Sequence, residues 1–296
     1  MEDKFKTSIK TFAIERLKFD DCRFTGSRVD ETIPLYEKWL KEGNHGEMTY
    51  LENHLKFKQN PELLLKSARS AIVVIKNYKN TKTRNLEGDL KVARYAAGED
   101  YHLVMTEKLK ELTAFIKNLD KTIECYSGVD SRPLPERALA LKAGIGFLGK
   151  NSMVIKPGLG SYFFIGIILT TTSLEEDRPL SWNCGQCRLC LDACPTNALG
   201  EGFAFNATKC ISYMTIEKKT PLTGEELKQT NGWIFGCDIC QEVCPYNHDN
   251  ITLTDWPQFL PSNGIGFDFK TDSIPKNTAL YRSRKRLLAN VNNLKR

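Results

Sequence analysis

The chain has 296 residues, of which 41% are hydrophobic and 26% are charged. These values are typical of globular proteins and exclude a disordered chain, a collagen-like repeat and a coiled coil. At roughly 100–200 residues per domain, the length predicts about two domains. The net charge of +6 comes from the segment 281–296, which holds six basic residues and no acidic ones. The rest of the chain is therefore electrically balanced.

The N-terminus mixes acidic and basic residues and has neither the apolar core of a signal peptide nor a twin-arginine pair. The longest apolar run, 162–169, is far shorter than the roughly 20 residues that span a bilayer. We therefore expect a cytoplasmic protein without membrane contact, and a monomer. A reducing compartment seldom uses cysteines for disulfides, so the ten cysteines indicate metal or redox chemistry.

Helices and strands are expected to alternate up to residue 170. The expected helices cover 33–42, a stretch from Pro61, 100–119 and 135–143, the last of which ends at Gly144. The expected strands cover 71–75, 123–126, 153–155 and 162–170, with a turn at Pro157 and Gly158 before the last. This alternation predicts a mixed α/β domain of the α+β class over residues 1–175.

A charged, proline-containing segment, 174–179, is typical of a linker. Eight of the ten cysteines follow it, within 184–244. The sequence therefore predicts a second, ferredoxin-like domain over 176–250, followed by a C-terminal extension with the basic tail over 251–296.

Cys184, Cys187, Cys190 and Cys194, followed by Pro195, match the C-x2-C-x2-C-x3-C-P spacing with which bacterial ferredoxins hold [4Fe–4S] clusters. A second set keeps the last part of this pattern but has its first cysteine displaced upstream. Its members are Cys210, Cys237, Cys240 and Cys244, followed by Pro245.

In two-cluster ferredoxins the fourth cysteine of each run ligates the other cluster. This rule assigns Cys184, Cys187, Cys190 and Cys244 to one cluster, and Cys194, Cys210, Cys237 and Cys240 to the other. Zinc also binds C-x2-C pairs, but zinc does not explain two C-x3-C-P runs. Cys22 and Cys125 have no place in either set, and the simplest interpretation of both is core packing.

The segment GIGFLGK, 144–150, superficially matches nucleotide-binding glycine motifs, which require a strand before and a helix after. Here the order is reversed, so Gly144 is interpreted as a helix-ending glycine. The polar loop from Asp130 to Arg137, considered alone, is explained by a helix cap and surface ion pairs. A lone His102 at a helix start is likewise usually structural.

Eight stretches, in family order, resemble epoxyqueuosine reductase, the last enzyme of queuosine biosynthesis. The ordered set carries the resemblance more than any one stretch does. The stretches are VARY (92–95), DYH (100–102), VDSRPLPER (129–137), GIGFLGKNS (144–152), GSYFFIG (160–166), CGQCRLCLDACPTNAL (184–199), CISYMTIEKK (210–219) and GCDICQEVCPYN (236–247).

The resemblance implies a tRNA-modifying oxidoreductase that uses cobalamin and two [4Fe–4S] clusters, fed by an external one-electron donor. Its substrate would be epoxyqueuosine at the wobble position of the anticodon, reduced to queuosine. Because an alkoxide is a poor leaving group, the opening epoxide needs a proton. The resemblance makes Asp130 the proton donor, provided that partial burial raises the pKa of its carboxyl, and makes Tyr101 and His102 pocket residues. An ionised Asp130 assisted by solvent is the competing interpretation.

Four side chains are expected to contact the corrin, and their alternative role is to support the cluster thiolates. They are Asp130, Val154, Ser212 and Asp238. Four cations are expected to contact tRNA phosphates, although lysines are often merely solvated. They are Lys218, Lys219, Arg284 and Arg286. Longer family members continue into a C-terminal helical-repeat domain, so the resemblance implies a short form.

Two alternatives stay open at this point. One is an enzyme resembling corrinoid reductive dehalogenases, which share the cofactor set and are commonly exported with a twin-arginine signal. The other is an iron–sulfur electron-transfer module without an active site of its own.

Overall fold

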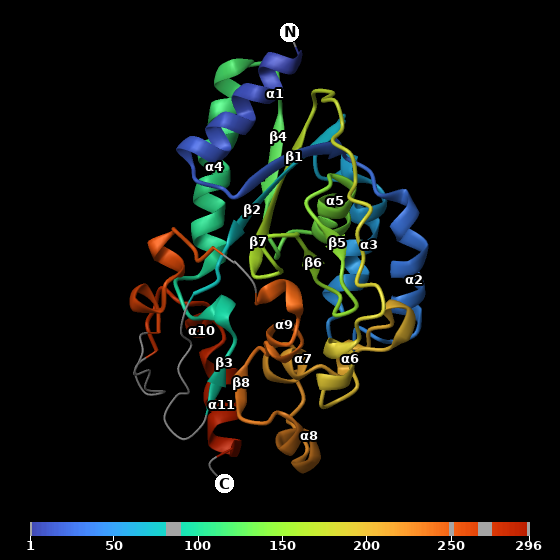
Figure 1. Ribbon diagram of the computed structural model, residues 1–296, viewed down its shortest axis with the longest axis vertical. Helices are drawn as coiled ribbons and strands as arrows, with labels where there is room; N and C mark the ends of the chain where they lie inside the picture. Colours follow the sequence, from blue (N-terminus) through green and yellow to red (C-terminus); the bar gives the residue numbers. More distant parts are fainter. Residues whose placement is uncertain (1, 81–89, 249–251, 266–273, 295–296) are drawn as a thin grey trace.

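The computed structural model describes residues 2–80, 90–248, 252–265 and 274–294. Lys295 and Arg296 of the basic tail lie outside the described residues. A central sheet and its covering helices occupy one end of an elongated molecule, and the cysteine-rich segment occupies the other (Figure 1). Within the described ranges, no helix is both long enough and apolar enough to cross a membrane.

The central sheet has four antiparallel strands in the order β1 (Asp21–Gly26), β2 (Ser70–Asn77), β7 (Phe163–Thr170) and β4 (Cys125–Gly128). Every residue of β2 is buried, as its β-branched run predicts for a central strand. The antiparallel pairing makes this domain α+β, which confirms the expected fold class.

Side chains on the two faces of β2 pack into two separate hydrophobic cores, because alternate side chains of a strand point in opposite directions. Ile72 and Val74 pack under α4 (Tyr101–Leu119) and α1 (Glu2–Thr11), whereas Val73 and Ile75 pack under α5 (Glu136–Lys142). Burying a side chain of this size contributes roughly 1.5–3 kcal/mol. The strand therefore joins both helical layers to one sheet. A π-helical turn, Phe12–Arg16, continues α1.

Several predicted elements are confirmed and several are wrong. The helix expected over 33–42 is α2 (Ile33–Lys41), and the strand expected over 123–126 is β4, which begins two residues later. No α-helix begins at Pro61: α3 (Tyr50–Gln59) ends just before it, and only a 3-10 turn, Pro61–Leu63, follows. The three consecutive leucines after Pro61 have no helical period, which explains the error.

The residues around Pro157 do not form a hairpin with β7. Instead, β6 (Val154–Ile155) pairs with β5 (Phe147–Leu148), while β7 joins the central sheet. Gly144 ends α5 with a φ of +75°, as expected for a helix-ending glycine. A side chain at Gly144 would also collide with the carbonyl oxygen of Arg178.

The cysteine-rich region contains short helices joined by turns. They are α6 (Leu189–Ala193), α7 (Ile211–Ile216), α8 (Gly224–Gln229) and α9 (Ile239–Glu242). This region is tied to the first part of the chain by β3 (Lys91–Val92), which pairs in parallel with β8 (Trp233–Phe235). The helices α10 (Ala279–Arg282) and α11 (Arg284–Leu294) pack against β8 and α7. The three-part domain division stays a prediction.

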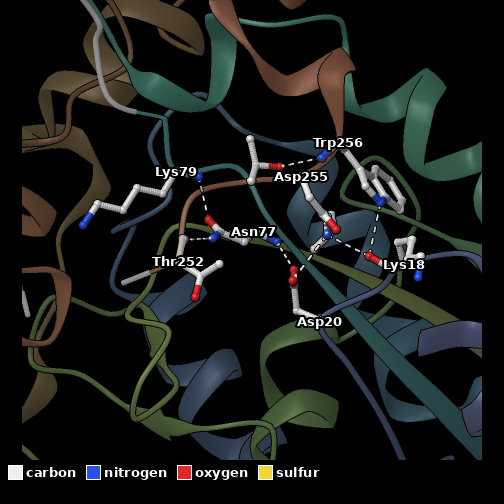
Figure 2. Close-up of polar contacts among 9 residues, drawn as sticks. Lys18, Asp20, Asn77, Lys79, Thr252, Asp255 and Trp256 are labelled. Atoms are coloured by element: carbon white, nitrogen blue, oxygen red, sulfur yellow. Dashed lines mark hydrogen bonds and ion pairs between the residues drawn. The ribbon is translucent and has the colours of Figure 1, made fainter. Parts of the chain in front are cut away.

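A buried lysine holds the C-terminal segment against the sheet. Lys76, on β2, has a side chain only 1% exposed, and its Nζ donates to the carbonyl oxygen of Lys18 at 2.7 Å. It also forms ion pairs with Asp20, at 3.3 Å, and with Asp255. Figure 2 shows Asp20, Asp255 and Trp256 gathered at this point. The segment that begins after the cysteine region therefore returns to the first domain.

Candidate active site

The first quartet of cysteines is brought together by two distant segments. Cys184, Cys187 and Cys190 precede or begin α6, Cys244 follows α9, and all four line one pocket. The Cys244 thiol interacts electrostatically with the other three, and burial raises its pKa to about 11. The structure thus groups the cysteines as the ferredoxin spacing predicts. Their role as cluster ligands stays a prediction.

The second quartet lies beside the first. The Cys240 thiol interacts electrostatically with Cys237 and Cys210, and Cys237 interacts with Cys210 and Cys194. Burial raises the pKa of Cys237 to about 12 and raises the pKa of Cys240 well above its ordinary value. Cys240 also interacts with Cys190 of the first quartet, so the two sets are neighbours.

The donor chemistry of both quartets fits [4Fe–4S] clusters. In such a cluster each thiolate binds a different iron atom, so the four cysteine sulfurs surround the whole cluster and do not converge on a single metal ion. Among the described residues, no group of three or more His, Cys, Asp or Glu side chains is arranged to hold a single metal ion. Iron binds the thiolate form, so bound iron would replace the proton of each thiol.

Asp130 lies two residues beyond the end of β4, in a left-handed conformation with a φ of +48°. Its carboxylate is 59% exposed. The Asp130 carboxylate is therefore accessible from solvent. Its Oδ2 accepts hydrogen bonds from Tyr101 Oη at 2.6 Å and from His102 Nε2 at 3.0 Å.

Tyr101 and His102 are placed by the first turn of α4. Asp100 is the helix N-cap, and its Oδ1 accepts the backbone N–H of His102 at 3.1 Å and contacts His102 Nδ1 at 2.7 Å. The Tyr101 ring is stacked on Phe164 of β7, with ring centroids 4.2 Å apart. Arg282, on α10, reaches the other oxygen of Asp100 at 3.4 Å. One imidazole is thus held between two carboxylates.

His102 and the two carboxylates shift one another's pKa values. Burial alone would lower the pKa of His102, but its bonds to Asp100 and Asp130 raise the pKa above its ordinary value. Burial raises the pKa of Asp130, but hydrogen bonds from His102 and Tyr101 outweigh burial and lower the pKa. The expectation that burial leaves Asp130 with a raised pKa is therefore wrong. Both ring nitrogens face carboxylates, so the imidazolium with two N–H donors satisfies both.

The expected corrin contacts lie on three different elements. Val154 is buried on β6, Ser212 is the second residue of α7, and Asp238 is the N-cap of α9. Asp238 Oδ2 accepts the backbone N–H of Arg94 at 2.7 Å, while its buried Oδ1 has no partner among the described residues. Burial raises the pKa of Asp238 to about 7. The orphaned oxygen fits cobalamin, because the amide side chains of a corrin are donors that would satisfy it.

Sequence reasoning gave no site role to three charged residues around Asp130. Glu136 begins α5, and its Oε1 accepts the backbone N–H of Asp130. Arg137, beside it, is exposed, and its guanidinium donates to the carbonyl oxygen of Ser152 at 2.7 Å. Lys58, on α3, interacts electrostatically with Glu136. The E-R pair directly after the loop was the available signal.

The four expected RNA-contacting cations differ in their environments. Lys218 is only 15% exposed and is paired with Glu226, whereas Lys219 is exposed. Arg284 is exposed and lies over the Tyr281 ring. Arg286 Nη2 donates to the carbonyl oxygen of Met214 at 2.9 Å. Lys219 and Arg284 are therefore the better placed of the four for an external phosphate.

Two family profiles match the chain. Residues 58–131 match "Epoxyqueuosine reductase QueG, DUF1730", and residues 183–247 match "4Fe-4S double cluster binding domain". The chain is 36% identical over 281 residues to an epoxyqueuosine reductase of Cellulophaga algicola, covering 93% of this chain and 91% of that protein. It is 40% identical over 239 residues to one of Synechocystis sp., covering 79% and 81%.

Solved structures agree with the sequence relatives. A selenomethionine-labelled epoxyqueuosine reductase matches with a TM-score of 0.86 at 28% identity, covering 99% of this chain and 82% of that chain. An epoxyqueuosine reductase with an epoxyqueuosine-modified tRNA-Tyr stem loop matches with a TM-score of 0.84 at 27% identity, covering 99% and 81%. The chain belongs to the epoxyqueuosine reductase family.

Proposed function

We propose that this protein reduces epoxyqueuosine to queuosine at the wobble position of tRNA, with cobalamin and two [4Fe–4S] clusters as its cofactors. The reaction takes up two electrons and two protons, converts the epoxide to an alkene and releases the oxygen as water. The observation that carries the proposal is the Asp100–His102–Asp130 arrangement in a chain that also brings together two cysteine quartets.

The protein must deliver a proton to the epoxide oxygen as its C–O bond breaks, because an alkoxide is a poor leaving group. We propose that Asp130 donates this proton and that His102 stores it. The one proton can lie on His102 Nε2 or on Asp130 Oδ2, which are 3.0 Å apart. The low pKa of Asp130 then poses no obstacle, because the imidazolium recharges the carboxylate.

Tyr101 and Asp100 orient the side chains of Asp130 and His102. The Tyr101 hydroxyl donates to the Asp130 oxygen that also faces His102, which fixes the carboxylate rotamer. Asp100, with a side chain only 3% exposed, holds Nδ1–H of His102 and so directs Nε2 toward Asp130. The helix N-cap thereby also determines the orientation of the imidazole.

When bound, cobalamin would supply the reducing electrons at the substrate, and the clusters would supply electrons to it. We propose that four side chains contact the corrin: Asp130, Val154, Ser212 and Asp238. We also propose that each quartet holds one cluster. The first quartet is Cys184, Cys187, Cys190 and Cys244, and the second is Cys194, Cys210, Cys237 and Cys240. An external one-electron donor must then reduce the clusters. We further propose that the protein is a cytoplasmic monomer.

Lys219 and Arg284 are the proposed phosphate contacts, since both are exposed. Cations on the surface supply affinity for RNA that does not depend on sequence, whereas the displaced wobble base supplies recognition.

Anaerobic reconstitution tests the proposal. The purified chain should bind about eight iron atoms with matching sulfide, bind cobalamin, and convert an epoxyqueuosine-containing stem loop to queuosine with a low-potential donor. Loaded protein that binds cobalamin but converts only organohalides would favour the dehalogenase alternative. Loaded clusters without cobalamin binding would leave only an electron-transfer module.

A further inference from the structure

Glu136 is attached to the loop that carries Asp130. It is the first residue of α5, and its Oε1 accepts the backbone N–H of Asp130. The left-handed conformation of Asp130 is unfavourable for residues other than glycine and needs support from its surroundings. In this conformation the Asp130 carboxylate reaches Tyr101 and His102. The contact from Glu136 therefore acts on the backbone that aims the acid.

A second contact holds the same loop from the other side. Lys58 Nζ, on α3, donates to the carbonyl oxygen of Leu134 at 3.0 Å. Lys58 and Glu136 attract each other electrostatically. Between the two anchored positions, Ser131 and Arg132 are exposed. The loop is thus fixed at both ends, whereas its middle is exposed to solvent.

Glu136 and Lys58 are both half-buried, which fits a supporting role rather than a surface one. Burial raises the pKa of Glu136 to about 8 and lowers the pKa of Lys58 to about 8. A carboxyl group keeps an acceptor oxygen whether or not it is charged. The hydrogen bond from the Asp130 N–H therefore needs an acceptor oxygen and not a negative charge. A glutamine at position 136 should accept the same hydrogen bond.

We propose that Glu136 is a positioning residue which, together with Lys58, fixes the loop 130–135 so that Asp130 faces the substrate. The inference rests on the proposed function, since it acts through Asp130. The proposal predicts that loss of the Glu136 acceptor oxygen leaves the Asp130 backbone N–H without this hydrogen bond and displaces the Asp130 carboxyl group.

Amide hydrogen exchange of the reconstituted protein tests the positioning without any assay of turnover. In Glu136→Ala, a peptide that spans 127–133 should exchange its most protected amide about tenfold faster than in the unaltered protein. Glu136→Gln should keep the original rate. Asp120→Ala is the matched control, because Asp120 also accepts a backbone N–H, from Thr122 at 2.8 Å, at a turn far from Asp130 in the chain.

Kinetics on the stem loop give the second readout. Glu136→Ala should lower kcat by about 10- to 100-fold and change KM by less than about twofold, since the acid is misplaced while RNA contacts stay. Glu136→Gln should restore kcat. If Glu136→Ala does not fold, Lys58→Met, which removes the other anchor, should show the same two effects more weakly.

Two results would overturn the inference. One is unchanged amide exchange and kcat in Glu136→Ala. The other is an equal loss of kcat in Glu136→Ala and Glu136→Gln, which would make the charge, and not the acceptor oxygen, the requirement. Failure of the proposed function looks different, because the unaltered protein itself would then convert no epoxyqueuosine while the exchange rates could still follow the prediction.

Discussion

The Nε2 atom of His102 lies 3.0 Å from Oδ2 of Asp130, and this contact joins the N-terminus of α4 to the loop after β4. Asp130 alone does not have the properties of a good acid at neutral pH. Asp130 has a lowered pKa, whereas His102 has a raised one. We propose that the two together hold one proton close to the place where it is needed.

Asp100→Asn should make turnover more sensitive to alkaline pH. The bonds to Asp100 and Asp130 keep the pKa of His102 raised, so the pair holds its proton to higher pH than free histidine does. Without the Asp100 carboxylate, the pKa of His102 should fall and the alkaline loss of kcat should begin at lower pH. A pH profile of kcat for both proteins checks this. Profiles that coincide would contradict it.

Cysteine variants should sort into the two predicted quartets. Cys184→Ser and Cys244→Ser should alter the same electron paramagnetic resonance signal, because both would ligate the first cluster. Cys194→Ser and Cys210→Ser should alter the other signal. Cys125→Ser is the control: this half-buried thiol lies on β4, and both signals should persist. A shared signal for Cys184→Ser and Cys194→Ser would contradict the crossed assignment.

Lys76→Met should destabilise the fold without affecting the site. Removing the buried cation leaves Asp20, Asp255 and the carbonyl oxygen of Lys18 without their partner, at a cost of about 1–3 kcal/mol. The melting temperature should fall by several degrees. Lys110→Met is the control, since its ion pair with Glu107 is exposed and is worth less than about 1 kcal/mol. Equal melting temperatures for the two variants would show that the network does not hold the C-terminal segment.

The cations of the C-terminal region should separate into two groups. Arg284→Ala should weaken binding of the stem loop and reduce its salt dependence while leaving the melting temperature unchanged. Arg286→Ala should lower the melting temperature, because Arg286 donates to the carbonyl oxygen of Met214 and burial lowers the pKa of its guanidinium. Binding and thermal unfolding measured on both variants distinguish the groups. The assignment fails if Arg284→Ala binds RNA with unchanged affinity and salt dependence.

The sequence predicted the elements whose signals are local. The run 71–75 became the buried strand β2, and the spacing of eight cysteines predicted which thiols lie together. The strand β1 was missed because DCRFTG has only two apolar side chains, Cys22 and Phe24, and its strand conformation depends on pairing with β2. Edge pairing of this kind depends on tertiary context.

The same limit applies within the site. Asp130 and His102 could be named from motifs, but their shared proton depends on a contact between residues 28 positions apart. The support from Glu136 and Lys58 could not be predicted either. Lys58 reaches the loop across 76 residues of sequence, and the effect of burial on its charge follows only from the packing of α3.

Turnover of epoxyqueuosine by the unaltered protein and by Asp130→Asn, loaded with cofactors and compared side by side, tests the proposed proton delivery. The asparagine variant should hold the same iron, because Asp130 lies outside both cysteine quartets, and the same cobalamin, because asparagine keeps the size and one carbonyl oxygen of the proposed corrin contact. Mass spectrometry of the stem loop should show loss of one oxygen atom with the unaltered protein and a rate about 10²–10⁴-fold lower with the variant. Equal rates in the two proteins would contradict the assignment of Asp130, and no conversion by either loaded protein would contradict the proposed reaction.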